Sequence, residues 1–224
     1  MPDVDPSDRE GEGARGRHVV DHRAGMVVER RFLAPYLATL TPERWDAPTL
    51  CDGWRVRDIV AHLTYSWSNT LLGVPTWLRH RDDVDRAFAL YARRRAKASH
   101  EVLLRRYRNA IESDYRPPRV TPEVLWCDNV VHGLDIRRPC GLRYPGTAET
   151  LTAVAETLTA MTWPSRHACR SAGLRLVATD VEWSIGDGPE IVGPIEDVLL
   201  TIAGRRPGDL AVTGDGVALV AQRL

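Results

Sequence analysis

The first two thirds of the chain place apolar residues at helical intervals. Residues 19–40 and 54–67 both show this spacing. In the second segment Val56, Ile59 and Val60 follow the i, i+3, i+4 pattern of a seam buried on one face of a helix. We therefore predict a helix in each segment, with its apolar face turned toward a common core.

Three further segments continue the helical pattern. Residues 82–114 form a long, arginine-rich amphipathic stretch, and residues 146–161 read as a later helix. Between them, residues 121–138 open with Thr121 as a capping residue and Pro122 in the first turn, both common at helix starts. Four or five helices with short connections predict a mainly α protein built on an antiparallel bundle.

The pattern changes after Gly173. Residues 174–180 and 181–188 are short, β-prone and bounded by turn formers, which predicts two strands. Residues 193–205 predict an amphipathic helix. Residues 209–224 contain a Gly-Asp-Gly turn, and we predict a short strand on each side of it.

These patterns divide the chain into three parts. Residues 1–17 are rich in charge, Gly and Pro, which predicts a disordered tail. Residues 18–170 form the predicted helical bundle, and residues 171–224 form a small α+β domain that follows it.

Composition and charge narrow the class of protein. The formal net charge is zero, so no excess of positive charge is available for a phosphate backbone, and we expect no nucleic-acid partner. No stretch approaches the roughly 20 apolar residues of a membrane span, and no secretory signal is evident, which predicts a cytoplasmic protein without membrane contact. The four cysteines are irregularly spaced and are expected to be reduced thiols. We expect a monomer or a weak dimer.

One segment carries candidate chemistry. In "WCDNVVHGLD", Asp128 and His132 are four residues apart and therefore project from the same face of a helix. His62 lies beside the apolar seam of the earlier helix. If the two helices are neighbours, two imidazoles and one carboxylate converge, a set that suits a divalent metal, most simply Zn²⁺. Three protein ligands would leave a coordination position open, as in catalytic sites.

Spacing alone also admits simpler interpretations. A histidine near a helix seam is commonly a hydrogen-bonded core residue, which applies to His62. An acid and a histidine four apart, such as Asp128 and His132, often only stabilise their helix. Asp135 is placed either to orient His132 or to pair with nearby Arg138.

Three motifs resemble one known family. "WDAPTLCDGWRVRDIVAHL" and "VLWCDNVVHGLDIRRPCG" resemble two signatures of the mycothiol-dependent maleylpyruvate isomerase family. The C-terminal "LRLVATDVEWSIGDGPEIVGPIEDVLLTIAGRRPGDLAVTGDG" resembles the C-terminal domain of the same family. The three motifs occur in the family order, and the resemblance covers about residues 20–224.

This resemblance implies a DinB-like four-helix bundle that binds a divalent metal, followed by a small α+β domain. It assigns His62, Asp128 and His132 to the metal and implies that Arg205, from the second domain, reaches the active site as a catalytic and cofactor-binding residue. It also implies mycothiol as the thiol co-substrate and an actinobacterial source, which fits the use of arginine at 29 of the 30 basic positions. The family usually has Glu where this chain has Asp128, and a side chain shorter by one methylene puts the activity of the metal site in question.

The resemblance predicts an enzyme in which zinc activates a thiol for addition to a small electrophilic substrate, giving either cis–trans isomerisation or S-transfer. In this mechanism Arg205 would hold a carboxylate or enolate as negative charge develops. Two alternatives remain open: a metal-assisted hydrolase on the same bundle, and a non-catalytic module that binds a metal or ligand.

Overall fold

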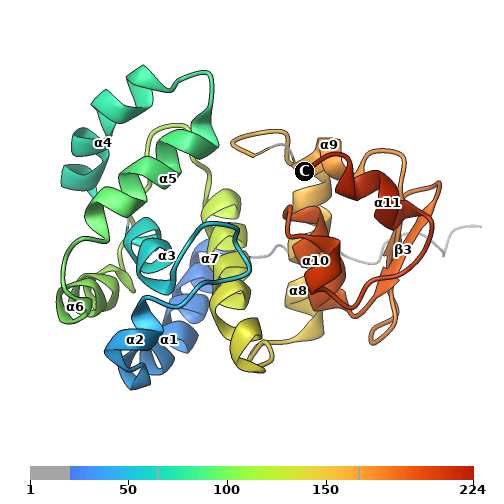
Figure 1. Ribbon diagram of the computed structural model, residues 1–224, viewed down its shortest axis with the longest axis horizontal. Coiled ribbons are helices and arrows are strands. Elements are labelled where there is room, and N and C mark those ends of the chain that lie inside the picture. Colours follow the sequence, from blue (N-terminus) through green and yellow to red (C-terminus); the bar gives the residue numbers. More distant parts are fainter. Residues whose placement is uncertain (1–20, 65, 166) are drawn as a thin grey trace, which may run out of the picture.

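A computed structural model describes residues 21–64, 66–165 and 167–224. The tail predicted for residues 1–17 lies outside the described residues. A helical bundle forms one side of the molecule, and a three-stranded sheet with its covering helices forms the other (Figure 1). The predicted fold, mainly α with a small α+β part at the C-terminal end, is confirmed.

Four helices make up the bundle: α1 (His22–Thr39), α3 (Val56–Leu63), α6 (His100–Ala110) and α7 (Pro122–Arg137). Helix α1 packs along α7 and α6, and α3 packs on α6 and α7. Leu37, Ile59 and Leu103 meet in the core, each almost fully buried, so the predicted seam of the second helix faces the interior.

Shorter elements extend the bundle. Helix α2 (Pro42–Trp45) follows α1, helix α5 (Val84–Arg95) packs on α3, and helix α4 (Trp67–Arg79) packs on α5. The stretch at 82–114 is therefore two helices, α5 and α6, and not one. The chain turns between Ala96 and Ser99, and Ser99 becomes the N-cap residue of α6.

The remaining elements form the C-terminal part. After the short helix η1 (Arg138–Cys140), helices α8 (Ala148–Ala160) and α9 (His167–Ser171) lead into the sheet. The elements that follow are β1 (Arg175–Ala178), β2 (Ser184–Ile185), β3 (Glu190–Gly193), α10 (Ile195–Ile202), η2 (Pro207–Asp209) and α11 (Gly216–Ala221). Strand β1 lies in the middle of the sheet, antiparallel to β2 and parallel to β3, with Leu176 opposite both Ile185 and Ile191.

One part of the C-terminal prediction was wrong. The residues after the Gly-Asp-Gly turn form helix α11, whereas only Thr213, before the turn, pairs with the sheet, through Val192. A short apolar run does not by itself distinguish a strand from a helix. Here α11 packs on β3, and Val220 is buried against it.

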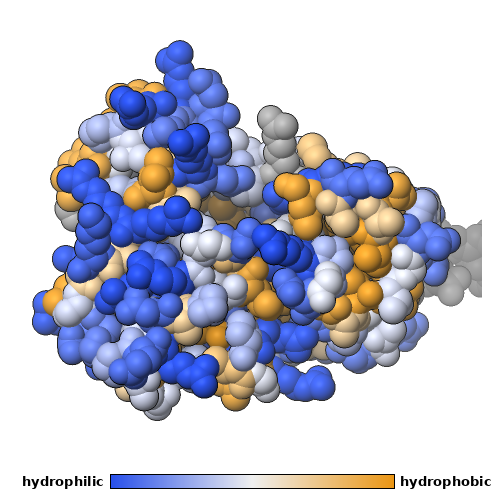
Figure 2. All heavy atoms as spheres, viewed as in Figure 1, coloured by the Kyte–Doolittle hydropathy of each residue, from blue (hydrophilic) through white to orange (hydrophobic). Residues whose placement is uncertain are grey.

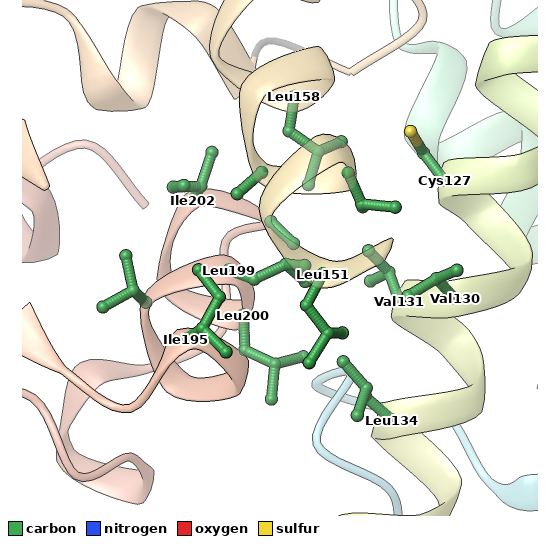
Figure 3. Packing of buried hydrophobic residues seen from close by; sticks show 14 of the residues in the cluster. Cys127, Val130, Val131, Leu134, Leu151, Leu158, Ile195, Leu199, Leu200 and Ile202 are labelled. Atoms are coloured by element: carbon green, nitrogen blue, oxygen red, sulfur yellow. The ribbon is translucent and has the colours of Figure 1, made fainter. Parts of the chain in front are cut away.

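Helix α8 connects the two parts of the molecule. Leu151 and Leu158 on α8 lie between Val131 on α7 and Leu199 on α10 (Figure 3). Apolar packing is thus continuous from the bundle to the sheet, and α7 contributes to both hydrophobic clusters. The domain boundary between residues 170 and 171 stays a prediction.

No helix in the described ranges is long and apolar enough to cross a membrane. Hydrophilic residues cover much of the surface of the bundle in the view of Figure 2, and hydrophobic residues gather on the C-terminal part.

A buried acid on α1 makes the stability of the fold depend on pH. Glu29 accepts a hydrogen bond from the hydroxyl of Tyr144, and burial raises the pKa of Glu29 to about 7, while Tyr144 and Arg137 oppose that rise. The protonated acid is therefore favoured in the folded state. Its stabilising contribution is complete below the unfolded pKa near 4.5 and is lost as the pH rises through about 7.

We expect Glu29→Gln to remove this dependence. The difference in unfolding free energy between variant and wild type should shift by about 2 kcal/mol in favour of the variant from pH 5 to pH 8, because glutamine never ionises. Urea unfolding at both pH values measures the gain. The exposed Glu182→Gln variant is the control, and an equal gain in that variant would show that the effect does not arise at Glu29.

Candidate metal centre

Three predicted ligands converge between α3 and α7. The Nε2 atom of His62 lies 3.2 Å from Oδ2 of Asp128, and the Nε2 atom of His132 lies 3.4 Å from Oδ1 of the same carboxylate. One ligand atom from each residue can be chosen so that all three lie within 4.8 Å of one another. The side chains are 10–24% exposed, so the cluster is shielded but open to a ligand.

The fold explains this convergence. Asp128 and His132 are one turn apart on α7, and α3 packs against α7 so that His62 faces them. The shorter acid, Asp128, reaches both imidazoles at these distances without the additional methylene of a glutamate.

Asp135 fixes the orientation of His132. Its Oδ2 atom lies 2.8 Å from Nδ1 of His132. A carboxylate accepts a hydrogen bond from the protonated ring nitrogen, so the proton of a neutral His132 resides on Nδ1 and the Nε2 lone pair points to Asp128. Of the two interpretations of Asp135, the orienting role is the observed one, because Arg138 pairs instead with Glu196 and Asp197.

Arg205 reaches this cluster from the end of α10. Its Nε atom donates to Oδ1 of Asp135 at 2.7 Å, its Nη2 atom donates to Oδ2, and its Nη1 atom donates to the carbonyl of Ala203. Arg205 therefore contacts Asp135 behind His132, and the C-terminal part of the chain completes the support of a site on the bundle.

Each member of the buried pair keeps the other ionised. Burial alone would raise the pKa of Asp135, but the charge and hydrogen bonds of Arg205, together with His132, lower it overall. Burial alone would lower the pKa of Arg205, but Asp135 raises it overall. The pair is electrically neutral as a unit.

Aromatic rings hold the two histidines in place. Trp54 stacks on His132 with ring centroids 5.9 Å apart, and its edge meets His62 at 5.4 Å. Phe88 also packs against His62, with ring centroids 5.7 Å apart. The imidazoles are thus held by packing as well as by hydrogen bonds, which preorganises the cluster.

Cys51, His132 and Asp135 form a second cluster of potential ligand atoms. Asp135 already binds the guanidinium of Arg205, so a cation occupies that face of the carboxylate. Burial also raises the pKa of the Cys51 thiol to about 12, so the sulfur is not a thiolate at neutral pH. The cluster of His62, Asp128 and His132 is therefore the better metal candidate.

A cavity of about 760 Å³ opens beside the cluster. Aromatic residues Phe88, Tyr91 and Trp163 line its walls, and Arg170 and Arg205 reach it from the C-terminal part. Its volume suits a small molecule, and mostly apolar walls with a few polar groups are typical of ligand sites.

Sequence reasoning missed part of this site. No spacing in the sequence links His167 to a ligand site, yet His167 and Arg170 interact at the cavity wall. Sequence reasoning also considered only Arg138 as a partner for Asp135, whereas the arginine that binds Asp135 is Arg205. No local spacing signals these contacts, because they depend on how α9 packs on α10 and how α10 packs on α7.

Comparisons with known proteins agree with this geometry. Residues 27–135 match the sequence model of the mycothiol maleylpyruvate isomerase N-terminal domain. The fold is similar to the crystal structure of the mycothiol-dependent maleylpyruvate isomerase, with a TM-score of 0.59 and 11% sequence identity, over 87% of this chain and 91% of that one. A histidine-to-alanine mutant of that enzyme matches with the same values. No curated protein sequence matches this chain.

The family resemblance of the three motifs, the domain match and the shared fold lead to one conclusion. Residues 27–135 form a mycothiol maleylpyruvate isomerase N-terminal domain, and the chain as a whole has a fold similar to that of the mycothiol-dependent maleylpyruvate isomerase.

Proposed function

We propose that this protein is a divalent-metal-dependent enzyme that activates a low-molecular-weight thiol, mycothiol, for addition to a small electrophilic substrate. The observation that carries the proposal is the spacing of the ligand atoms. The Nε2 atoms of His62 and His132 each lie 3.4 Å from the same atom, Oδ1 of Asp128, which is longer than the about 2.7–2.9 Å of a charge-assisted hydrogen bond. Both distances match the edge, about 3.3–3.4 Å, of a tetrahedron whose corners lie about 2.0–2.1 Å from a central Zn²⁺.

His62, Asp128 and His132 would hold the metal. A bound Zn²⁺ would supply Lewis acidity at its open position, where a thiol becomes acidic enough to react as a thiolate at neutral pH. Asp135 keeps the Nε2 lone pair of His132 directed at the site. Trp54 packs against both imidazoles and Phe88 packs against His62, which holds the rings in place.

Arg205 has a supporting role in this proposal. The sequence suggested that it holds a carboxylate or enolate of the substrate, which stays a prediction. Its contacts favour a positioning role instead: the guanidinium fixes Asp135, and Asp135 fixes His132.

The reaction class follows from the thiol. The thiol sulfur adds to an electron-poor double bond, which becomes single and free to rotate. Elimination of the thiol then gives the trans isomer, whereas retention of the new carbon–sulfur bond gives S-transfer. Both outcomes use the same residues, and the 760 Å³ cavity beside the ligand cluster has room for an electrophile.

A thiol-dependence assay tests the proposal. Zinc-loaded protein is incubated with mycothiol and a panel of cis-unsaturated ketones and keto acids, and products are followed by proton NMR. We expect turnover that requires both the metal and the thiol, with the thiol regenerated in isomerisation and consumed in S-transfer. Turnover without thiol would favour the hydrolase, and metal binding without turnover on any substrate would favour the non-catalytic module.

A further inference from the structure

The cavity wall formed by α9 carries a cation that the proposed mechanism does not use. Arg170 lines the cavity together with His167, close to the backbone that leads to Arg205. We propose that Arg170 is the specificity-determining residue that holds a carboxylate of the substrate in this cavity. This inference rests on the proposed function and adds to it the residue that would bind an acidic group of the electrophile.

The guanidinium of Arg170 has unused donors. Its Nη1 atom lies 3.0 Å from Nδ1 of His167, to which it donates. Its Nε atom is buried without a hydrogen-bond partner, and its Nη2 atom donates to none of the described residues. No carboxylate of the described residues lies within 4.0 Å of it, and Asp85, which attracts it from farther away, accepts a hydrogen bond from Ser165.

Gly204 allows the guanidinium its position. A Cβ atom at residue 204 would lie 3.0–3.3 Å from Cζ, Nε and Nη1 of Arg170, closer than ordinary contact. Gly204 also has a φ of +89°, which disfavours any other residue. The turn that delivers Arg205 to Asp135 therefore also makes room for Arg170 at the cavity.

Two other arginines that line this cavity, Arg95 and Arg205, are already engaged. Asp135 neutralises Arg205 through two hydrogen bonds. Arg95 donates to the carbonyl groups of Ala61 and Thr64 and to the hydroxyl of Thr64. Of these three, Arg170 is the one with a buried side-chain nitrogen that has no hydrogen-bond partner among the described residues.

The surroundings of Arg170 favour an anion. Burial lowers its pKa, because no bound carboxylate compensates for the lost hydration of the guanidinium. His167 adds no charge, since burial and the two arginines lower its pKa to about 4. A planar carboxylate accepts two parallel N–H groups from a guanidinium, which makes it the natural ligand for this side chain.

Binding of a carboxylate probe tests this role without turnover. Maleate and its uncharged dimethyl ester are titrated into the protein by calorimetry, with and without added zinc and in the absence of thiol. We expect maleate to bind more tightly than the ester. In Arg170→Gln the maleate affinity should fall about tenfold or more, while affinity for the ester stays unchanged.

Two further variants sharpen the test. Arg170→Lys keeps the charge but not the fork geometry and should recover part of the affinity. Arg81→Gln removes an exposed arginine of the same cavity and should bind maleate as the wild type does. Thermal melting verifies that each variant is folded.

The inference is overturned if wild type binds maleate no better than the ester, or if a folded Arg170→Gln keeps the wild-type affinity. A failure of the proposed thiol chemistry would leave these binding results unchanged, so the two proposals fail separately.

Discussion

The His132→Ala variant is expected to lose its divalent metal. Removing one of three protein ligands leaves only His62 and Asp128, and two protein ligands are too few for a stable zinc site. The loss should exceed the about 10–100-fold effect typical of removing a residue that only orients a ligand. Competition with a chromophoric chelator measures the zinc affinity of variant and wild type, and activity should fall in parallel.

His100→Ala is the matched control. His100 lies on α6, beside Glu101 and Trp45, away from the ligand cluster. Its replacement should leave zinc affinity within about twofold of wild type. Unchanged affinity in a folded His132→Ala protein would show that the metal assignment is wrong.

The Arg205→Ala variant is expected to lose about 3–5 kcal/mol of unfolding free energy, because Asp135 would remain buried without its counter-ion. That amount is a large share of the stability of an ordinary domain. Arg205 and Asp135 are 9% and 0% exposed, so the carboxylate that remains starts from a poorly hydrated position. Urea unfolding measures the effect.

The neighbouring residue provides the control. Arg206 pairs with Asp52 at 2.7 Å, but both side chains are largely exposed. Arg206→Ala should therefore cost at most about 1 kcal/mol. Similar costs for the two variants would show that burial does not make the pair of Arg205 and Asp135 more important than an exposed ion pair.

Much of the fold and the centre of the site could be predicted from the sequence. The i, i+4 spacing placed Asp128 and His132 on one face, and the cap at Thr121 fixed the start of their helix. His62 followed from its place beside a buried seam. These are local features, which depend on neighbouring residues in the chain.

The features that could not be predicted depend on long-range packing. Arg205 contacts Asp135, which lies 70 residues earlier in the chain. Arg170 lies close to Gly204 because α9 packs on α10. The residues after Gly214 follow a helical course against β3, although their apolar run would also suit a strand. In each case the chain has several local options, and the packed partner selects one.

The two parts of the chain contribute different functions to one site. The bundle supplies the candidate ligands on α3 and α7, whereas the C-terminal part supplies Arg205 behind His132 and Arg170 at the cavity. Packing of α8 between α7 and α10 keeps these groups in register (Figure 3).

The most direct test of the metal centre is anomalous X-ray diffraction at the zinc edge from crystals of the zinc-loaded protein. We predict one strong anomalous peak about 2.0–2.1 Å from Nε2 of His62, Nε2 of His132 and an oxygen of Asp128. A peak only elsewhere, or no peak in crystals grown with zinc, would contradict the proposed metal centre.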